Sequence, residues 1–151
     1  MPRPAELLAL ALLGIGCHQP PAVVARAGNI EISHPYAFAP VIGDEGSAYF
    51  TMKNAGATAD TLTGVSAGKA TAMLHGSRES GGVVRMVMLD ILPLKPGETV
   101  ALAVGQIHLM LTGLDPVPHP GDTLQLTLTF AHGGPATLGV PVYRYGESPA
   151  E

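Results

Sequence analysis

Charge is scarce in this 151-residue chain, in which Asp, Glu, Lys and Arg together make up 13% and the formal net charge is -4. Without a basic excess, the protein has no positive field to hold nucleic acid phosphates or an anionic membrane surface. The composition therefore excludes nucleic acid as the expected partner. The length favours a single domain, which can bury enough surface to be stable without disulfides.

A long hydrophobic run is also missing. The apolar run at residues 7–15 is shorter than the roughly 20 residues of a transmembrane helix. It follows Arg3 and precedes Cys17, the only cysteine, so residues 1–17 resemble an export signal. Cys17 stands where a bacterial lipoprotein signal places its lipid-modified residue, although an ordinary cleaved signal or a short anchor with an incidental cysteine is the alternative. We expect an exported protein in the periplasm or on the outer face of the cytoplasmic membrane.

Glycine and proline are plentiful, at 19 and 14 residues, and they separate short apolar runs. This pattern is typical of turns that join many strands. Residues 124–130, for example, alternate apolar with polar side chains, so one face is expected to be buried. Because no long helical period follows residue 27, we predict an all-β fold, an antiparallel Greek-key β-sandwich. The predicted strands are 29–33, 46–53, 60–65, 71–76, 83–89, 99–104, 108–114, 123–131 and 136–143.

The domain organisation follows from the same pattern. Residues 18–28 are rich in proline and alanine and are predicted to form a linker. The folded domain is expected at residues 29–145, and the polar residues 146–151 are expected to form a tail.

Histidine and methionine occur in a pattern that indicates a metal site. His108 and Met110 project from the same face of a predicted strand, because side chains alternate with a period of two. His75 ends another predicted strand, a loop over residues 76–82 follows, and Met86 lies on the returning strand. The pair His75 and Met86 is therefore expected to flank the mouth of a hairpin.

Two imidazoles with two thioethers select a particular ion. Thioether sulfur is soft and uncharged, so it suits copper(I) and contributes little to calcium, magnesium or zinc binding. The lack of a cysteine in the domain argues against a blue-copper electron carrier, which needs a thiolate. We expect one copper(I) ion per chain, held by His75, Met86, His108 and Met110.

Each of these residues has a simpler interpretation when it is taken alone. A methionine in a strand is usually core filler, and a histidine is usually solvated or satisfied by hydrogen bonds. Met88 shares a strand face with Met86 and is a candidate reserve ligand, but we assign it to core packing. We also assign Met52 and Met73 to packing, although Met73 lies on the face of His75. The remaining histidines, at positions 18, 34, 119 and 132, are expected to be solvated.

The spacing of the four residues resembles the motif of the periplasmic copper chaperone family called PCuAC. Ten residues separate His75 from Met86, twenty-one separate Met86 from His108, and one separates His108 from Met110. The resemblance extends over about residues 30–142 and includes Ala-Tyr-Phe at 48–50, Lys-Pro-Gly at 95–97 and the run His-Leu-Met-Leu-Thr-Gly-Leu at 108–114. It departs at Phe38, where the family often has Arg, and at Gly76, where it often has an acidic residue that could affect the orientation of His75.

The resemblance implies a cupredoxin-like sandwich with copper(I) at an exposed edge. It also implies a metallochaperone that delivers copper to an apo acceptor protein, with the dinuclear copper centre of cytochrome c oxidase subunit II as the usual acceptor. We expect the protein to be a monomer. No nucleophile with an adjacent base is apparent, so we do not expect an enzyme. Two alternatives stay open: a copper(I) store or buffer, and a metal-free sandwich that acts as an interaction module.

Overall fold

The computed structural model describes residues 22–147 and residue 149, and all regular structure in them is β-strand. Within this part of the chain no helix is long and apolar enough to span a membrane. The strands are β1 (Val23–Ala27), β2 (Ile30–Phe38), β3 (Gly46–Asn54), β4 (Asp60–Ser66), β5 (Thr71–Ser80), β6 (Val83–Leu89), β7 (Leu92–Leu94), β8 (Thr99–Ala101), β9 (His108–Thr112), β10 (Thr123–Phe130) and β11 (Gly134–Tyr143). The predicted all-β class is confirmed.

The strands form one curved sheet in the order β6-β5-β9-β3-β2-β11-β10-β4-β7, with β1 added to β2 and β8 added to β3. The pairing is antiparallel except between β11 and β2, where Val142 and Tyr143 pair in parallel with Ala37 and Phe38. The sheet is therefore mixed and not wholly antiparallel as predicted, because the strand pattern in a sequence does not give strand direction. The Greek-key connection stays a prediction.

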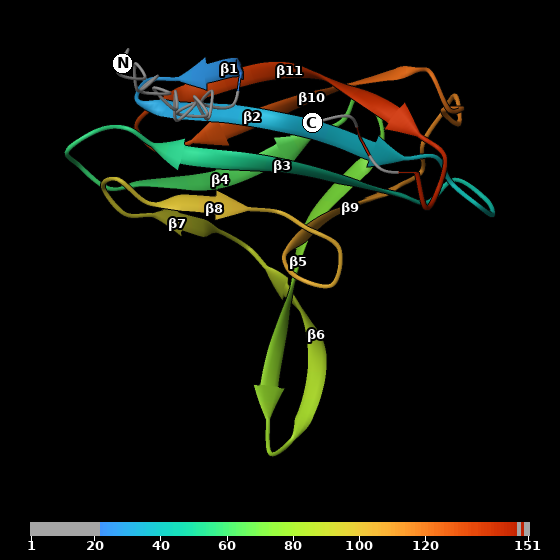
Figure 1. Ribbon diagram of the computed structural model, residues 1–151, viewed down its shortest axis with the longest axis horizontal. Coiled ribbons are helices and arrows are strands. Elements are labelled where there is room, and N and C mark those ends of the chain that lie inside the picture. Colours follow the sequence, from blue (N-terminus) through green and yellow to red (C-terminus); the bar gives the residue numbers. More distant parts are fainter. Residues whose placement is uncertain (1–21, 148, 150–151) are drawn as a thin grey trace, which may run out of the picture.

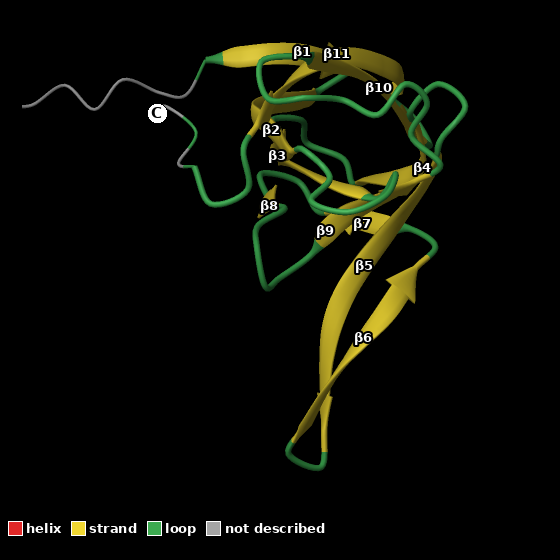
Figure 2. Cartoon of the chain, turned by 90° about the vertical axis from the view of Figure 1, so that its right-hand side faces the viewer, coloured by secondary structure: helices red, strands yellow, loops and turns green. Residues whose placement is uncertain are grey.

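The core lies between the two layers that this curved sheet forms (Figure 2). Alternate residues of each strand point inward, as the period of two requires. Leu126 and Leu128 of β10 are fully buried in the same apolar cluster as Leu109 and Leu111 of β9. Removal of this apolar surface from water is the main stabilising contribution to the fold. Because Leu109 and Leu111 point into the core, His108 and Met110 lie on the opposite face of β9.

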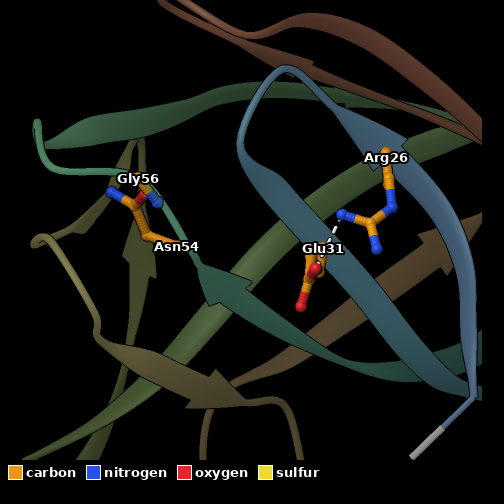
Figure 3. A network of polar contacts seen from close by, with 4 residues as sticks. All are labelled: Arg26, Glu31, Asn54 and Gly56. Atoms are coloured by element: carbon orange, nitrogen blue, oxygen red, sulfur yellow. Dashed lines mark hydrogen bonds and ion pairs between the residues drawn. The ribbon is translucent and has the colours of Figure 1, made fainter.

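The domain begins earlier than the sequence pattern predicted. Val23–Ala27, assigned to a linker, form β1 and pair with β2. Ala27 is buried in the core, and Arg26 forms an ion pair of 2.6 Å with its cross-strand partner Glu31 (Figure 3). The segment is ordered because its backbone forms hydrogen bonds with β2, a pairing that the local proline-rich and alanine-rich composition does not reveal. The signal, Cys17 and residues 18–21 lie outside the described residues.

Two further strand segments were missed because they contain proline, which cannot donate to a strand ladder. In β2 the register shifts between Ser33 and Tyr36, so Pro35 sits at an irregularity and the strand continues to Phe38. Pro93 lies in β7, which is the last strand of the sheet order. Both prolines therefore occupy positions where a missing donor disturbs little.

The buried side chain of Asn54 fixes the chain reversal after β3. Its Oδ1 accepts a hydrogen bond of 2.9 Å from the backbone N-H of Gly56 (Figure 3). Its Nδ2 donates to the carbonyl oxygens of Thr58, at 2.8 Å, and Leu94, at 3.1 Å. One amide thus joins the connection between β3 and β4 to β7.

The hairpin of β5 and β6 projects away from the sandwich (Figures 1 and 2). The loop predicted at residues 76–82 is much shorter, since β5 continues to Ser80 and pairs there with Val83. Gly81 and Gly82 make the turn, with φ of 62° and 76°. A two-residue turn with both φ values positive matches the twist of a hairpin, and glycine adopts it without strain. β6 is the edge strand at the other end of the sheet order from β7.

Candidate metal centre

The two predicted histidine ligands lie side by side. His75 on β5 and His108 on β9 are direct cross-strand partners. Their ring centroids are 5.6 Å apart, with an angle of 79° between the ring planes. Directly opposed residues of an antiparallel pair point to the same face of the sheet. The fold therefore brings together two imidazoles that are 33 positions apart in the sequence.

Thioethers extend this face on the β9 side. Met110 lies two residues beyond His108 on the same strand and is directly opposite Met73 of β5. Both side chains are partly buried. Met73 therefore faces a proposed ligand, and the inference that it shares the face of His75 is consistent with this register.

The methionines of β6 lie on the other side of the histidine pair. Met88 is directly opposite His75, whereas Met86 is opposite Ser77, two residues further towards the hairpin tip. The exposed fractions of the two residues are 61% for Met88 and 68% for Met86. The assignment of Met88 to core packing is therefore wrong, because β6 is an edge strand on a projecting hairpin and leaves this side chain largely exposed. Met52, in contrast, is fully buried in the core, as predicted.

His108 is held in one orientation by its own loop. Its Nδ1 lies 3.1 Å from the backbone carbonyl oxygen of Gln106. A carbonyl oxygen only accepts hydrogen bonds, so Nδ1 carries the proton and Nε2 presents a free lone pair. Metal-binding histidines commonly donate their second N-H to an acceptor in this way.

His75 has a different surrounding. Its Nδ1 is buried and is the only buried side-chain nitrogen or oxygen of the described residues without a hydrogen-bond partner. A buried polar atom without a partner costs roughly 1–3 kcal/mol. A metal ion bound at this nitrogen would replace the missing partner. The donor set thus fits a soft ion, with two imidazoles flanked by uncharged sulfur.

Gly76 does not act on His75 in the way that its departure from the PCuAC pattern suggested. Adjacent residues of a strand point to opposite faces, so a side chain at position 76 would point away from the imidazole of His75. A Cβ there would lie 3.0 Å from Cδ1 of Leu89. The glycine therefore accommodates the packing of Leu89.

The described residues contain no second cluster of metal-binding side chains built from carboxylate, imidazole or thiolate groups. Among them no group of three or more His, Cys, Asp or Glu side chains is placed to hold an ion. His34, His119 and His132 are exposed and distant from one another in sequence, as expected for solvated residues, while His18 lies outside the described part. The side chains that the strand registers bring next to His75 and His108 have uncharged sulfur atoms and are those of Met73, Met110, Met86 and Met88.

Aromatic side chains continue the same sheet face beyond Met110. Ser47 of β3 pairs with Met110 and accepts a hydrogen bond of 3.0 Å from the Tyr49 hydroxyl. The ring of Tyr36 stacks on that of Tyr49 at a centroid distance of 4.7 Å. Burial raises the pKa of Tyr36, and the neighbouring Tyr49 adds to the effect. The sheet face thus continues from Met110 into packed aromatic side chains, whereas the methionines of the hairpin strand β6 are exposed. This cluster was not predicted from the sequence, because its rings meet only through the pairing of β2 with β3.

Comparison with known proteins agrees with this architecture. Residues 30–142 match the LpqE-like family, whose description is "Putative lipoprotein LpqE-like", and the chain belongs to that family. A protein of Leifsonia xyli subsp. xyli (strain CTCB07) named "Putative lipoprotein Lxx21020" is 27% identical over an alignment of 138 residues, which covers 88% of this chain and 82% of that protein.

Solved structures of PCuAC domains share the fold. The apo PCuAC domain of PmoF2 has a TM-score of 0.71 at 24% identity, covering 84% of this chain and 99% of that domain. The copper-bound form of the same domain has a TM-score of 0.67 at 24% identity over 83% and 99% of the two chains. The apo PCuAC domain of PmoF1 has a TM-score of 0.65 at 26% identity over 78% and 96%. The resemblance to the PCuAC family predicted from the sequence is confirmed.

Proposed function

We propose that this protein binds one copper(I) ion per chain through His75, Met86, His108 and Met110 and passes it to an acceptor, without catalysing a reaction. The observation that carries the proposal is the opposed pair of imidazoles, 5.6 Å apart, with thioethers on both sides. The free Nε2 of His108 and the unpartnered Nδ1 of His75 supply the nitrogen donors. The copper-bound state of the PmoF2 domain supports copper as the ion.

The exposure of the centre favours delivery over storage. Met86 is on an edge strand and is largely exposed, so an acceptor can reach the ion from the hairpin side. The ligands are uncharged, whereas thiolate is anionic and softer, so copper(I) favours a thiolate-bearing acceptor. The dinuclear copper domain of cytochrome c oxidase subunit II is the acceptor that the family resemblance suggests.

The location of the protein is part of the same proposal. Membership of a lipoprotein family supports export and attachment to a membrane through Cys17, with the domain in the periplasm or on the outer face of the cytoplasmic membrane. We propose that the domain acts as a monomer.

Copper binding is tested by titrating the full chain with copper(I) against a competing chelator under reducing conditions. One ion per chain is the expected result, and its loss in a His75→Ala/His108→Ala variant is expected because both nitrogen donors are removed. No copper(I) binding by the wild-type protein would contradict the proposal and leave the interaction module as the function.

Delivery is tested by mixing the loaded protein with a reduced apo acceptor that has paired cysteines. Transfer should be faster in direct contact than across a dialysis membrane, because an acceptor that touches the centre replaces ligands without release of the ion. Equal rates in the two arrangements would indicate release through solvent and would make the protein a store.

A further inference from the structure

The centre has more thioethers than the four-residue motif uses. Met88 lies directly opposite His75, and Met86 lies one diagonal step away on the same strand and the same face. Directly opposed residues have Cβ atoms about 4.5–5.5 Å apart, and diagonal neighbours are about 7–8 Å apart, still within reach of long side chains. Both methionines of β6 are therefore within reach of an ion held at His75.

The two side chains are closely matched in chemistry and surroundings. Each is an unbranched thioether with three rotatable bonds, which adapts to many geometries. Each is more than half exposed, at 61% for Met88 and 68% for Met86, so neither is fixed by core packing. Register favours Met88, because it faces His75 directly. Nothing in their placement restricts binding to Met86.

We propose that Met88 and Met86 share one coordination position of the copper centre. The ion stays bound to His75, His108 and Met110, and its remaining thioether comes from either methionine of β6. This inference rests on the proposed function and adds a ligand that the motif spacing alone does not identify.

The exchange between the two methionines is balanced and needs no other reactant. One copper–sulfur bond breaks and one copper–sulfur bond forms, with no change in charge or oxidation state. The step takes place at the edge strand, on the exposed side of the centre. An acceptor that approaches during an exchange meets an ion with three ligands and adds its thiolate as the fourth.

The test is a double-mutant cycle on copper(I) affinity, with the variants Met86→Leu, Met88→Leu and the double variant. If both methionines contribute equal bound states, loss of one removes half of those states and lowers the affinity by about twofold. Loss of both removes the position and should lower the affinity by about tenfold or more, so the two effects are not additive. X-ray absorption should count two sulfur ligands in each single variant and one in the double variant.

The controls make each outcome decisive. Met52→Leu, in the core, reports any general effect of the Met to Leu change, and circular dichroism with thermal unfolding reports the fold. If Met86→Leu alone equals the double variant, Met88 is not a ligand and the inference is overturned. If Met88→Leu alone equals the double variant, Met86 is not a ligand and the inference is also overturned. In both cases the wild type still binds copper(I), so copper binding by the protein stands, and the second case would only replace Met86 by Met88 in the proposed ligand set. Failure of the proposed function itself would appear as absence of copper from the wild type.

Discussion

At the scale of single residues, the two histidines of the candidate centre differ in the hydrogen bonding of Nδ1. His108 donates from Nδ1 to the carbonyl oxygen of Gln106, whereas Nδ1 of His75 is buried without a partner. The hydrogen bond of His108 fixes the tautomer of its ring. The unpartnered Nδ1 of His75 is available as a ligand for a metal ion. These features depend on the loop before β9 and on the packing around β5, and neither is visible in the spacing of the motif.

Met110→Leu should separate copper binding from folding. The change is nearly volume-conserving, so the free energy of unfolding should fall by less than about 1.5 kcal/mol. Copper(I) affinity should fall by about tenfold or more, the factor that 1.4 kcal/mol represents, because a partly buried thioether is removed from the centre. Chelator competition and urea unfolding measure the two effects. Met52→Leu is the matched control, and an equal loss of affinity in that variant would contradict the assignment of Met110 as a ligand.

Asp60 is a residue whose contribution depends on pH. Burial by itself raises the pKa of its carboxyl group, but hydrogen bonds from the backbone N-H groups of Thr61, His132 and Gly133 favour the charged form, as does the charge of His132, and they hold the pKa below its usual value. A pKa lower in the folded state than in the unfolded state adds stability above the unfolded value, near pH 4, and the contribution is lost as the pH falls through the folded value.

Asp60→Asn should therefore destabilise the protein at pH 7 by roughly 1–3 kcal/mol, because a carboxylate oxygen that accepts backbone hydrogen bonds is replaced by an amide donor. The difference from wild type in the free energy of unfolding should narrow below about pH 4, because there the Asp60 carboxyl group takes up a proton in the unfolded chain before it does so in the folded protein. Urea unfolding at a series of pH values measures it. Asp90→Asn, at an exposed position, is the control and should change little. A difference that stayed constant down to pH 2 would contradict this account.

At the scale of elements, the hairpin of β5 and β6 holds two of the four proposed ligands, His75 and Met86. Its inner end pairs with β9 and supplies His75, while its outer end has exposed side chains on both strands. An element with few buried apolar contacts opens at lower free energy than the core. The outer part of the hairpin should therefore open without unfolding of the sandwich.

Gly82→Ala should loosen the hairpin selectively. Gly82 has a φ of 76°, and a residue with a Cβ costs roughly 1–2 kcal/mol in such a left-handed conformation. We expect faster amide hydrogen exchange in β6 and the outer half of β5, with little change in the global unfolding midpoint. Gly64→Ala, in β4, is the control, because a Cβ there meets its nearest atom at 4.0 Å and the φ is not positive. A large drop in global stability in Gly82→Ala would mean that the hairpin folds as one unit with the core.

At the scale of the whole molecule, an ion that binds the folded state and not the unfolded chain stabilises the protein by mass action. Free copper(I) at about 100 times its dissociation constant should add about 2.7 kcal/mol to the free energy of unfolding. Thermal unfolding should therefore shift upward by several degrees under reducing conditions. Zinc should produce a much smaller shift, because thioethers add little to its binding. An equal shift with zinc that is lost in Met110→Leu would contradict the choice of copper(I).

The sequence by itself determined the all-β class, the approximate place of most strands and the histidine and methionine pattern. These depend on local alternation, on turn residues and on spacing along one chain, so they can be read without the fold. Glycine and proline located most of the turns. The predicted strands were wrong at Pro35 and Pro93, because each proline lies inside a strand. The loop predicted at residues 76–80 is part of β5.

Only the tertiary structure decided which methionines face the histidines. A shift of one residue in a strand register moves every side chain to the other face, and a shift of two moves each to a different partner. The register of β6 on β5 places Met88, not Met86, opposite His75. The register of β9 on the other edge of β5 places His108 opposite the same residue. Register and edge position arise from pairings between distant segments, and for that reason the exposure of Met88 and the strand formed by Val23–Ala27 could not be read from the residues alone.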